Sequence, residues 1–419
     1  MSAATSSSGT WRSRRSELSF VAMADERPNP DHNVYILGAG ASRDAGLPVI
    51  ANFMNRLRDS RPWLESAQRA DEVNAVDEVM RFRKSSATAA ERISVDLENI
   101  EDVFSLAAAT NNADLLGQLQ LAMAATLDFA RQTCSPRRVP VKLPFVPDAS
   151  LGPHPVGKDE QQRPTSWRCS VPVPLLYAGI MSGALCSSFA TMESTVITFN
   201  YDTSLEEYLS LLGVRYTYEI PTEFMSGNFL PRGAREPKGG PLRILKLHGS
   251  VNWAPLPSPN SSRLSIRDSY AEIRKLGATP LLIPPTWRKP IPESLLAVWD
   301  HAVNALRRAT RIIIVGYSVP TTDSFFRFLL GAGGINDTSS LRRVIFVNPA
   351  AKKLERRLRR VFRSDVLTRP IFTNTVATCE QLFCSRSNLE AIKRPWHPTV
   401  ECSAVDQSIP GFPFLRRET

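Results

Sequence analysis

The sequence predicts an α/β protein: a doubly wound parallel sheet with a helical insertion after the first strand–helix unit. Short, almost wholly apolar runs recur along the 419 residues, and each ends in a polar or glycine-rich turn. Such runs are typical of strands in a parallel sheet that helices cover on both faces. Stretches with helical spacing of apolar residues separate the runs, as expected for alternating strands and helices.

The first predicted strand is residues 34–37, and Gly38-Ala39-Gly40-Ala41-Ser42 follows it directly. We expect a helix to begin near Ser42 and to continue to about Arg58. Residues from about 60 to 133 have apolar side chains three and four positions apart, and they form the predicted insertion.

A proline-rich stretch covers about residues 134–174, where nine prolines fall between Pro136 and Pro174. Proline ends helices and is confined to the edges and ends of sheets. We therefore expect a long loop or linker there, without a helix or a central strand.

The later strands each lead into a motif with chemically active side chains. Residues 195–198 precede Phe199-Asn200-Tyr201-Asp202 and a helix over 205–212, and the short runs 215–218 and 243–247 follow, the second leading to His248. An amphipathic helix at 294–309 precedes two further strands, 312–315 and 344–347, which end in Gly316-Tyr317-Ser318 and Asn348. Because ligands bind beyond the carboxyl ends of parallel strands, we expect these motifs to form one site.

The ends of the chain and its charge suggest simpler roles. Residues 1–32 lack periodicity and are expected to be disordered, 33–365 form the α/β domain, and 366–419 form a C-terminal extension. The segment from Arg342 to Arg363 contains nine cationic residues and one acidic residue, and it accounts for most of the net charge of +10. Leu354, Leu358, Val361 and Phe362 indicate an amphipathic helix there with a solvated cationic face. A nucleic-acid surface is the alternative, but no binding motif accompanies it, and we expect no nucleic-acid partner.

The six cysteines form no C-x2-C pair and are expected to be free thiols in a reducing cytoplasm. No apolar stretch approaches the roughly 20 residues of a membrane-spanning helix, so we expect no membrane association.

Gly38 and Gly40 would let the backbone turn tightly beside a pyrophosphate, whose charge the following helix would stabilise. The usual dinucleotide fingerprint also needs a third glycine, where Arg43 stands, and an acid after the second strand. Neither is present, so the sequence does not predict a dehydrogenase.

Four segments, in order, resemble the motifs of the sirtuins. They are the run from Gly38 through Gly46 to Pro48, then Thr198-Phe-Asn200-Tyr-Asp202, Lys246-Leu-His248-Gly249, and Gly316-Tyr-Ser318 with Val347-Asn348. Their details are most similar to the sirtuin-like NADase domains of bacterial antiphage defence systems, as is Asn99-Ile-Glu101-Asp102 in the insertion. The resemblance covers about residues 33–60 and 194–350.

The resemblance implies a Rossmann-like fold and NAD as substrate, with attack at the nicotinamide ribose. It implies His248, Asn200 and Asp202 as catalytic residues. The implied NAD-binding residues are Gly38, Ala39, Gly40, Ser42, Gly46, Pro48, Thr198, Gly316, Ser318 and Asn348.

Each catalytic candidate has a chemical role and a structural alternative. His248, whose type titrates near neutral pH, would be the general base for a ribose hydroxyl or water. Asn200 would hydrogen-bond the ribose or the water, and Asp202 would orient Asn200 or stabilise developing positive charge. Alternatively, Asp202 caps the following helix and His248 is a packed or solvent-facing residue. An acidic, solvated helix face is likewise the simpler interpretation of Glu101 and Asp102.

Two departures from the family pattern bear on the reaction. Sirtuin deacylases hold zinc through four cysteines, which this sequence does not supply, and they have Asp-Phe-Arg where Val49-Ile50-Ala51 stands. We therefore expect no zinc and hydrolysis of NAD to nicotinamide and ADP-ribose, in antiphage defence. An NAD-dependent protein deacylase and a catalytically silent sensor of NAD or ADP-ribose are the alternatives.

Restraint of an NAD-consuming enzyme would require a homo-oligomer or a regulatory partner protein. The helical insertion is either a lid over the site or a fixed small domain.

Overall fold

The computed structural model describes residues 32–93, 95–143, 154–184, 193–220, 222–225, 242–256, 263–284, 291–318, 324–334, 341, 343–348, 350, 354 and 357. The predictions for the N-terminal segment before His32, for most of the basic helix after Asn348 and for residues 366–419 therefore lie outside the described residues.

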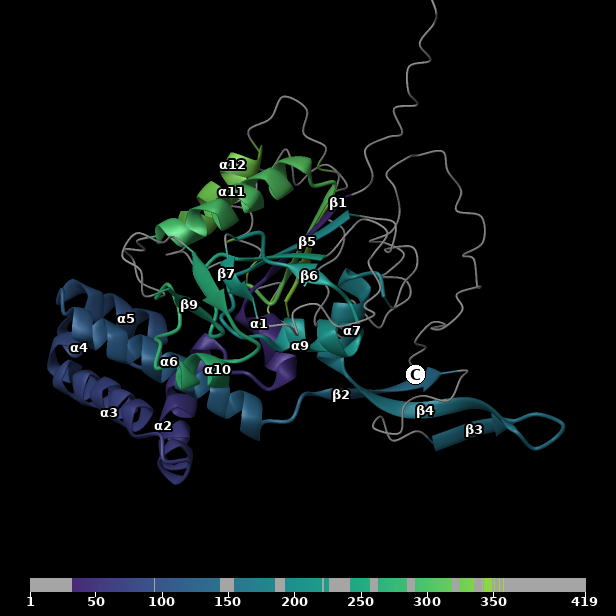
Figure 1. Ribbon diagram of the computed structural model, residues 1–419, viewed down its shortest axis with the longest axis horizontal. Helices are drawn as coiled ribbons and strands as arrows, with labels where there is room; N and C mark the ends of the chain where they lie inside the picture. The colour runs from purple at the N-terminus through teal and green to yellow at the C-terminus, as the bar shows by residue number, and fades with distance from the viewer. Residues whose placement is uncertain are drawn as a thin grey trace, which may run out of the picture. The chain divides into compact units, whose positions relative to one another are not determined.

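A six-stranded parallel sheet forms the centre of the fold and confirms the predicted class (Figure 1). Its order is β12-β11-β1-β5-β8-β6, and every neighbouring pair is parallel. The strands are β1 (His32–Leu37), β5 (Glu193–Thr198), β6 (Tyr216–Thr217), β8 (Leu242–Lys246), β11 (Arg311–Val315) and β12 (Arg343–Val347). The chain continues from β1 to β5 on one side, whereas β11 and β12 lie on the other, so the order switches between β1 and β11. Such a switch point is where open α/β sheets bind ligands.

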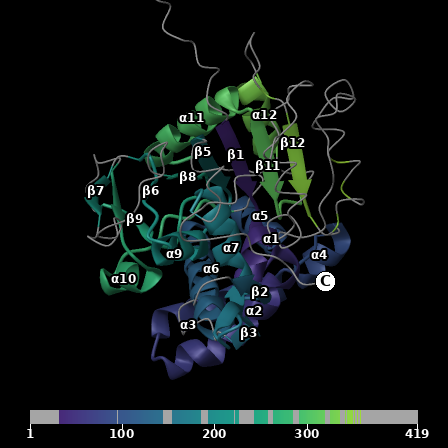
Figure 2. The same ribbon diagram turned by 90° about the vertical axis from the view of Figure 1, so that its right-hand side faces the viewer.

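Helices cover both faces of this sheet. Figures 1 and 2 show α11 (Glu293–Arg308) and α12 (Ser324–Gly334) on one face, and α7 (Val173–Met181) and α9 (Ser204–Leu211) on the other. Apolar side chains from all four helices join those of β1, β5, β8, β11 and β12 in one core. This double cover explains why the inner positions of β1, β5, β8, β11 and β12 are apolar.

The helix expected from Ser42 to Arg58 is wrong, because the chain forms two separate helices there. A short α1 (Ala39–Ser42) runs into a 3-10 turn (Arg43–Ala45), and α2 (Ile50–Ser66) begins only after Val49. Gly46 ends the first piece in the left-handed region, at φ 89°. Pro48 also disfavours helical geometry at the residue before it. A left-handed glycine and a nearby proline are ordinary signals that stop a helix.

The loop or linker expected for the proline-rich stretch is also wrong over much of its length. Strands β2 (Arg138–Leu143), β3 (His154–Lys158) and β4 (Pro164–Pro172) form an antiparallel sheet in the order β2-β4-β3. The prolines obey the rule for sheets: Pro140 and Pro155 lie in the edge strands, and those of the central strand stand at its two ends.

The stretch predicted as the insertion, about residues 60–133, is helical: it holds the end of α2, then α3 (Ala70–Ser85), α4 (Ala87–Ile93), α5 (Ile100–Ala109) and α6 (Ala113–Thr133). With the whole of α2 it is called the insertion below. Its core continues into the chain beyond His248, where Val251, Ala254, Tyr270, Ile273 and Leu282 join it. These residues lie in or near β9 (Trp253–Pro255) and α10 (Tyr270–Lys275). Strand β9 belongs to a small sheet with β10 (Leu264–Ile266) and β7 (Thr222–Met225), in the order β7-β10-β9. This shared core favours a fixed domain over a lid.

Among the residues that the structure describes, none of the helices has the length and apolar character needed to cross a membrane.

Candidate functional site

The loops after β1 and β11 pack directly against each other at the switch point. Gly40 N donates to Gly316 O at 2.8 Å, and Gly38 N donates to Val315 O at 3.0 Å. A Cβ on Gly316 would lie 2.1 Å from Ala41 N, and one on Gly40 would lie 2.6 Å from Gly316 O. Gly316 also has φ +63°, which side chains rarely adopt. Close packing between the two loops therefore requires glycine here independently of any ligand.

Asn200, Ser42 and Asp202 form one hydrogen-bonded group. Asn200 Nδ2 donates to Ser42 Oγ and to Gly38 O, both at 2.9 Å. Ser42 Oγ in turn donates to Asp202 Oδ2 at 2.7 Å. The structure thus brings these three predicted site residues together, and Ser42 is hydrogen-bonded to both of the others.

The Asp202 carboxylate makes two sets of contacts, one with each oxygen. Oδ1 accepts hydrogen bonds from the backbone N–H of Ser204, at 3.0 Å, and from the Ser204 hydroxyl, at the beginning of α9. Oδ2 accepts from Ser42, so Asp202 orients Asn200 through this hydroxyl. Asp202 is therefore both a helix-terminal acceptor and part of the predicted site.

His248 follows β8 and is 6% exposed. Its ring lies edge-on to Phe199, with the centroids 5.1 Å apart, and 6.0 Å from the ring of Tyr201. Its backbone oxygen accepts from Ile283 N at 2.8 Å. At the next residue, Gly249, the φ of +81° and a Cβ position 2.0 Å from Leu281 O require glycine. The aromatic contacts, both to residues that flank Asn200, place the imidazole beside the same loop.

The remaining predicted binding residues lie at the end of β5, at the turns after β11 and β12, and between β1 and α2. Thr198 Oγ1 accepts from Asn200 N at 3.1 Å and so supports this loop. Asn348 Nδ2 donates to Tyr317 O at 3.2 Å, which ties the end of β12 to the turn that holds Gly316 and Ser318. Ala39 lies in α1, whereas Gly46 and Pro48 lie in the turn before α2, where a Cβ on Gly46 would meet Cys134 at 2.8 Å.

Sequence analysis missed a buried ion pair beside this site. Lys246 Nζ donates to Glu206 Oε1 at 2.8 Å and also to the backbone oxygen of Asp202. Both side chains are buried, at 1% and 5% exposure. A lysine inside the otherwise apolar run at 244–247 was the available signal.

The acidic segment of the insertion has a local role. Asn99 caps α5 by accepting from Glu101 N at 2.9 Å, and Asp102 Oδ2 accepts from Asp96 N at 3.0 Å.

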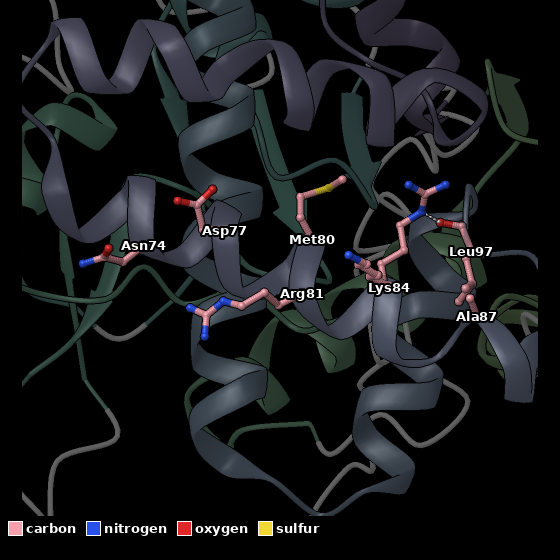
Figure 3. A pocket seen from close by; sticks show the side chains of 8 residues that line it. Asn74, Asp77, Met80, Arg81, Lys84, Ala87 and Leu97 are labelled. Atoms are coloured by element: carbon pink, nitrogen blue, oxygen red, sulfur yellow. Dashed lines mark hydrogen bonds between the residues drawn. The ribbon is translucent and has the colours of Figure 1, made fainter.

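A separate pocket with a volume of about 790 Å³ lies on the insertion (Figure 3). It is lined by side chains of α3 and its neighbours: Asn74, Asp77, Met80, Arg81, Arg83, Lys84, Ala87 and Leu97. The dashed line in Figure 3 is the hydrogen bond of 3.0 Å from Arg83 Nε to Leu97 O. The pocket contains none of the predicted site residues. Within the described ranges, no three His, Cys, Asp or Glu side chains are grouped to hold a metal ion.

Residues 194–368 match the family model described as the SIR2-like domain. The match contains the motifs at Asn200, His248, Gly316 and Asn348, and it begins well after the Gly38 loop. No curated protein matches the chain.

Several solved structures are similar to this chain. One, from work on the structural basis for the mechanism and regulation of Sir2 enzymes, is 14% identical, with a TM-score of 0.36 over 87% of this chain and 92% of its own. A mutant Sir2 homologue in complex with ADP-ribose is 14% identical, with a TM-score of 0.35 and the same coverage. A Sir2 homologue in complex with NAD is 14% identical, with a TM-score of 0.29 over 80% and 91%. Similarity at this level implies neither a shared ligand nor a shared activity.

Proposed function

We propose that this protein binds NAD and hydrolyses it to nicotinamide and ADP-ribose. The observation that carries the proposal is the convergence of the Gly38, Asn200, His248 and Gly316 motifs at one edge of the sheet. The group formed by Asn200, Ser42 and Asp202 supports it further, because it fixes an uncharged amide at the edge where open α/β sheets bind ligands. The SIR2-like match over residues 194–368 is consistent with this site.

In the proposed reaction, water attacks the anomeric carbon of the nicotinamide ribose. The glycosidic C–N bond breaks, its electron pair goes to the nicotinamide nitrogen, and nicotinamide leaves as a neutral molecule. Since the positive charge moves onto the ribose, rigid placement of ribose and water contributes more than acid catalysis.

Each site residue has one task in this scheme. Asn200 holds the water or the ribose hydroxyl through its amide oxygen, because its Nδ2 group already donates to Gly38 and Ser42. His248 accepts the proton of the attacking water. The Ser42 hydroxyl links Asp202 to Asn200: it donates to the Asp202 carboxylate and accepts from the Asn200 amide, and so orients that amide. Ser318 and Asn348 hold the adenosine ribose and phosphates.

Two other activities have less support. A sirtuin-type deacylase would need the four-cysteine zinc module, for which the sequence has no C-x2-C pair. A silent sensor would need no general base, yet His248 is retained beside the Asn200 loop.

The proposed biological role is depletion of NAD during antiphage defence. An unrestrained enzyme of this kind would harm its host, so we further propose that a partner protein or self-association restrains it. Residues 33–365 would form the NAD-binding domain in the cytoplasm.

The direct experiment incubates the purified full-length protein with NAD and separates nicotinamide, ADP-ribose and cyclic ADP-ribose by chromatography. The expected result is equal release of nicotinamide and ADP-ribose, at a rate about 100-fold or more lower with His248→Ala. A parallel reaction contains an acetylated peptide. Nicotinamide release that requires this peptide would instead establish the deacylase, and binding of NAD without any release, in vitro and in phage-infected cells, would establish the sensor.

A further inference from the structure

The buried ion pair between Lys246 and Glu206 is joined to the proposed site through the backbone. Lys246 stands at the carboxyl end of β8, and its ammonium donates to Glu206 Oε1 at 2.8 Å. It also donates to the backbone oxygen of Asp202. The same oxygen, Glu206 Oε1, also accepts from the Tyr218 hydroxyl at 3.1 Å. The pair therefore connects β8, the first turn of α9 and the loop between β5 and α9.

General stability does not explain a charged pair at this position. Removing two charges from water costs several kcal/mol for each ion, and well-packed apolar residues of similar volume often stabilise a protein equally well or better. Ile244, Leu245 and Leu247 beside it are apolar and buried, so an apolar residue would suit position 246. An apolar residue, however, has no donor for the Asp202 carbonyl. Position 246 therefore needs a side chain with a hydrogen-bond donor if the Asp202 backbone is to be held, and Lys246 supplies it.

Contacts continue without a break from this pair to Asn200. Lys246 holds the Asp202 backbone, Asp202 Oδ2 accepts from Ser42 at 2.7 Å, and Ser42 accepts from Asn200 at 2.9 Å. Lys246 also places a positive charge beside a loop that ends in the buried Asp202 carboxylate. A shift of this loop would move Asn200 and Asp202 together.

We propose that Lys246 and Glu206 are positioning residues: they fix the loop of residues 200–202. Asn200 and Asp202 are thereby held where both form their hydrogen bonds with Ser42. Lys246 supplies the contact to the loop, and Glu206 holds the ammonium in place by accepting a hydrogen bond from it. The catalytic consequence rests on the proposed function, whereas the effect on loop order does not.

The test compares two carboxylate-to-amide substitutions in the full-length protein. Glu206→Gln weakens the pair beside the site. Asp128→Asn is the matched control, since Asp128 is also buried, at 8% exposure, and accepts from the buried Arg69 at 2.6 Å in the insertion. Tyr218→Phe removes one hydrogen bond from Glu206 and serves as a milder second variant. The measurements are the melting temperature, hydrogen exchange of the backbone amides at 200–204, and kcat and KM for NAD.

We expect both amide variants to lower the melting temperature, but only Glu206→Gln to speed exchange at 200–204. It should lower kcat by about 10- to 100-fold through misplacement of Asn200, with KM changed less than about threefold. Tyr218→Phe should shift exchange and kcat in the same direction by a smaller factor. Unchanged exchange and kcat in both site variants, or equal losses in Asp128→Asn, would overturn the proposal. If the wild-type protein does not cleave NAD, the proposed function fails and the exchange comparison alone decides the positioning role.

Discussion

Asn200 and Ser42, 158 positions apart in the chain, are joined by a hydrogen bond of 2.9 Å from Nδ2 to Oγ. The single hydroxyl proton of Ser42 goes to Asp202 Oδ2, so this oxygen acts as the acceptor toward Asn200. The Asn200 amide is thereby fixed in one orientation, with Nδ2 toward the Gly38 loop and Oδ1 turned away from it. This arrangement ties the loops after two neighbouring strands, β1 and β5, into one unit.

Replacing Ser42 with alanine should remove the side-chain link between the loops after β1 and β5 that Ser42 makes. Ser42→Ala removes one hydrogen bond to a carboxylate and one from an amide, which should lower the unfolding free energy by about 1–3 kcal/mol. Turnover of NAD should fall by about 10- to 100-fold, because Asn200 loses its orientation. Ser60→Ala is the control: this buried hydroxyl donates only to Leu57 O, at 2.7 Å in α2, and turnover should not change. Equal turnover in both variants would show that Ser42 is dispensable.

Gly316 should tolerate alanine far less than Gly277 does, although both have φ +63°. At Gly277 nothing lies within 4 Å of an added Cβ, so Gly277→Ala should cost only the left-handed backbone term of about 1–2 kcal/mol. At Gly316 the Cβ would lie 2.1 Å from Ala41 N, so the two loops must separate. We expect Gly316→Ala to lower the unfolding free energy by about 2 kcal/mol or more beyond the control and to abolish ADP-ribose binding. Urea unfolding and calorimetry measure both effects, and similar results for the two variants would contradict the close packing of the loops.

His32 should make the protein acid-sensitive. Burial, together with the charges of Arg308 and Arg243, lowers the pKa of His32 from 6.5 to about 3. The unfolded chain therefore takes up a proton that the folded one does not, so stability that is present above pH 6.5 is lost as the pH falls toward 3.

The His32 contribution is isolated by comparing the wild-type protein with His32→Gln in urea at pH 7.5 and 5.0. Between these values the wild-type protein should lose about 2 kcal/mol more unfolding free energy than the variant. The subtraction removes the contribution of carboxylates that both proteins share. Parallel losses in the two proteins would show that His32 is not held neutral.

The sheet and most of the site were predictable because the strong signals are local. A short, mostly apolar run that leads into a Gly, Asn or His motif marks the carboxyl end of a buried strand, and parallel strands bring these ends to one edge. Asn200, His248 and Gly316 could therefore be grouped without knowing the strand order. The break at Gly46–Val49 was also visible in Gly46 and Pro48, but the helical pattern on either side concealed it.

Other parts depend on contacts between distant segments. Strand β4 is central in its sheet although prolines surround it, because they fall at its ends and in its neighbours. Proline density alone does not reveal such positions. Lys246 resembles an ordinary surface lysine until Glu206 and the Asp202 carbonyl are placed beside it. The glycines of the Gly38 loop are likewise required because the loop at Gly316, nearly 280 residues later, leaves no space for a Cβ atom.

The shared core of the insertion predicts the outcome of placing a charge inside it. Phe104 is fully buried and Ile100 nearly so, in a cluster that also holds Val251 and Leu282 near His248. Ile100→Asp and Phe104→Asp each bury a carboxylate without a partner, which costs several kcal/mol. We expect lower melting temperatures and reduced NAD turnover. The exposed Ala109→Asp on the same helix should change neither.

If the insertion were instead a lid, Ile100→Asp and Phe104→Asp would raise basal NAD loss in cells. That result, with soluble protein, would contradict a fixed domain.

The central claim is that Asn200 and His248 act on one bound NAD molecule, and the most direct measurement is nicotinamide release by Asn200→Ala and His248→Ala under conditions where the wild-type protein is active. Both variants should lose about 100-fold or more of the turnover. Both should keep the wild-type melting temperature within a few degrees and still bind ADP-ribose, because the proposed holders of its adenosine end, Ser318 and Asn348, are unchanged. Near wild-type nicotinamide release by both purified variants would contradict the account.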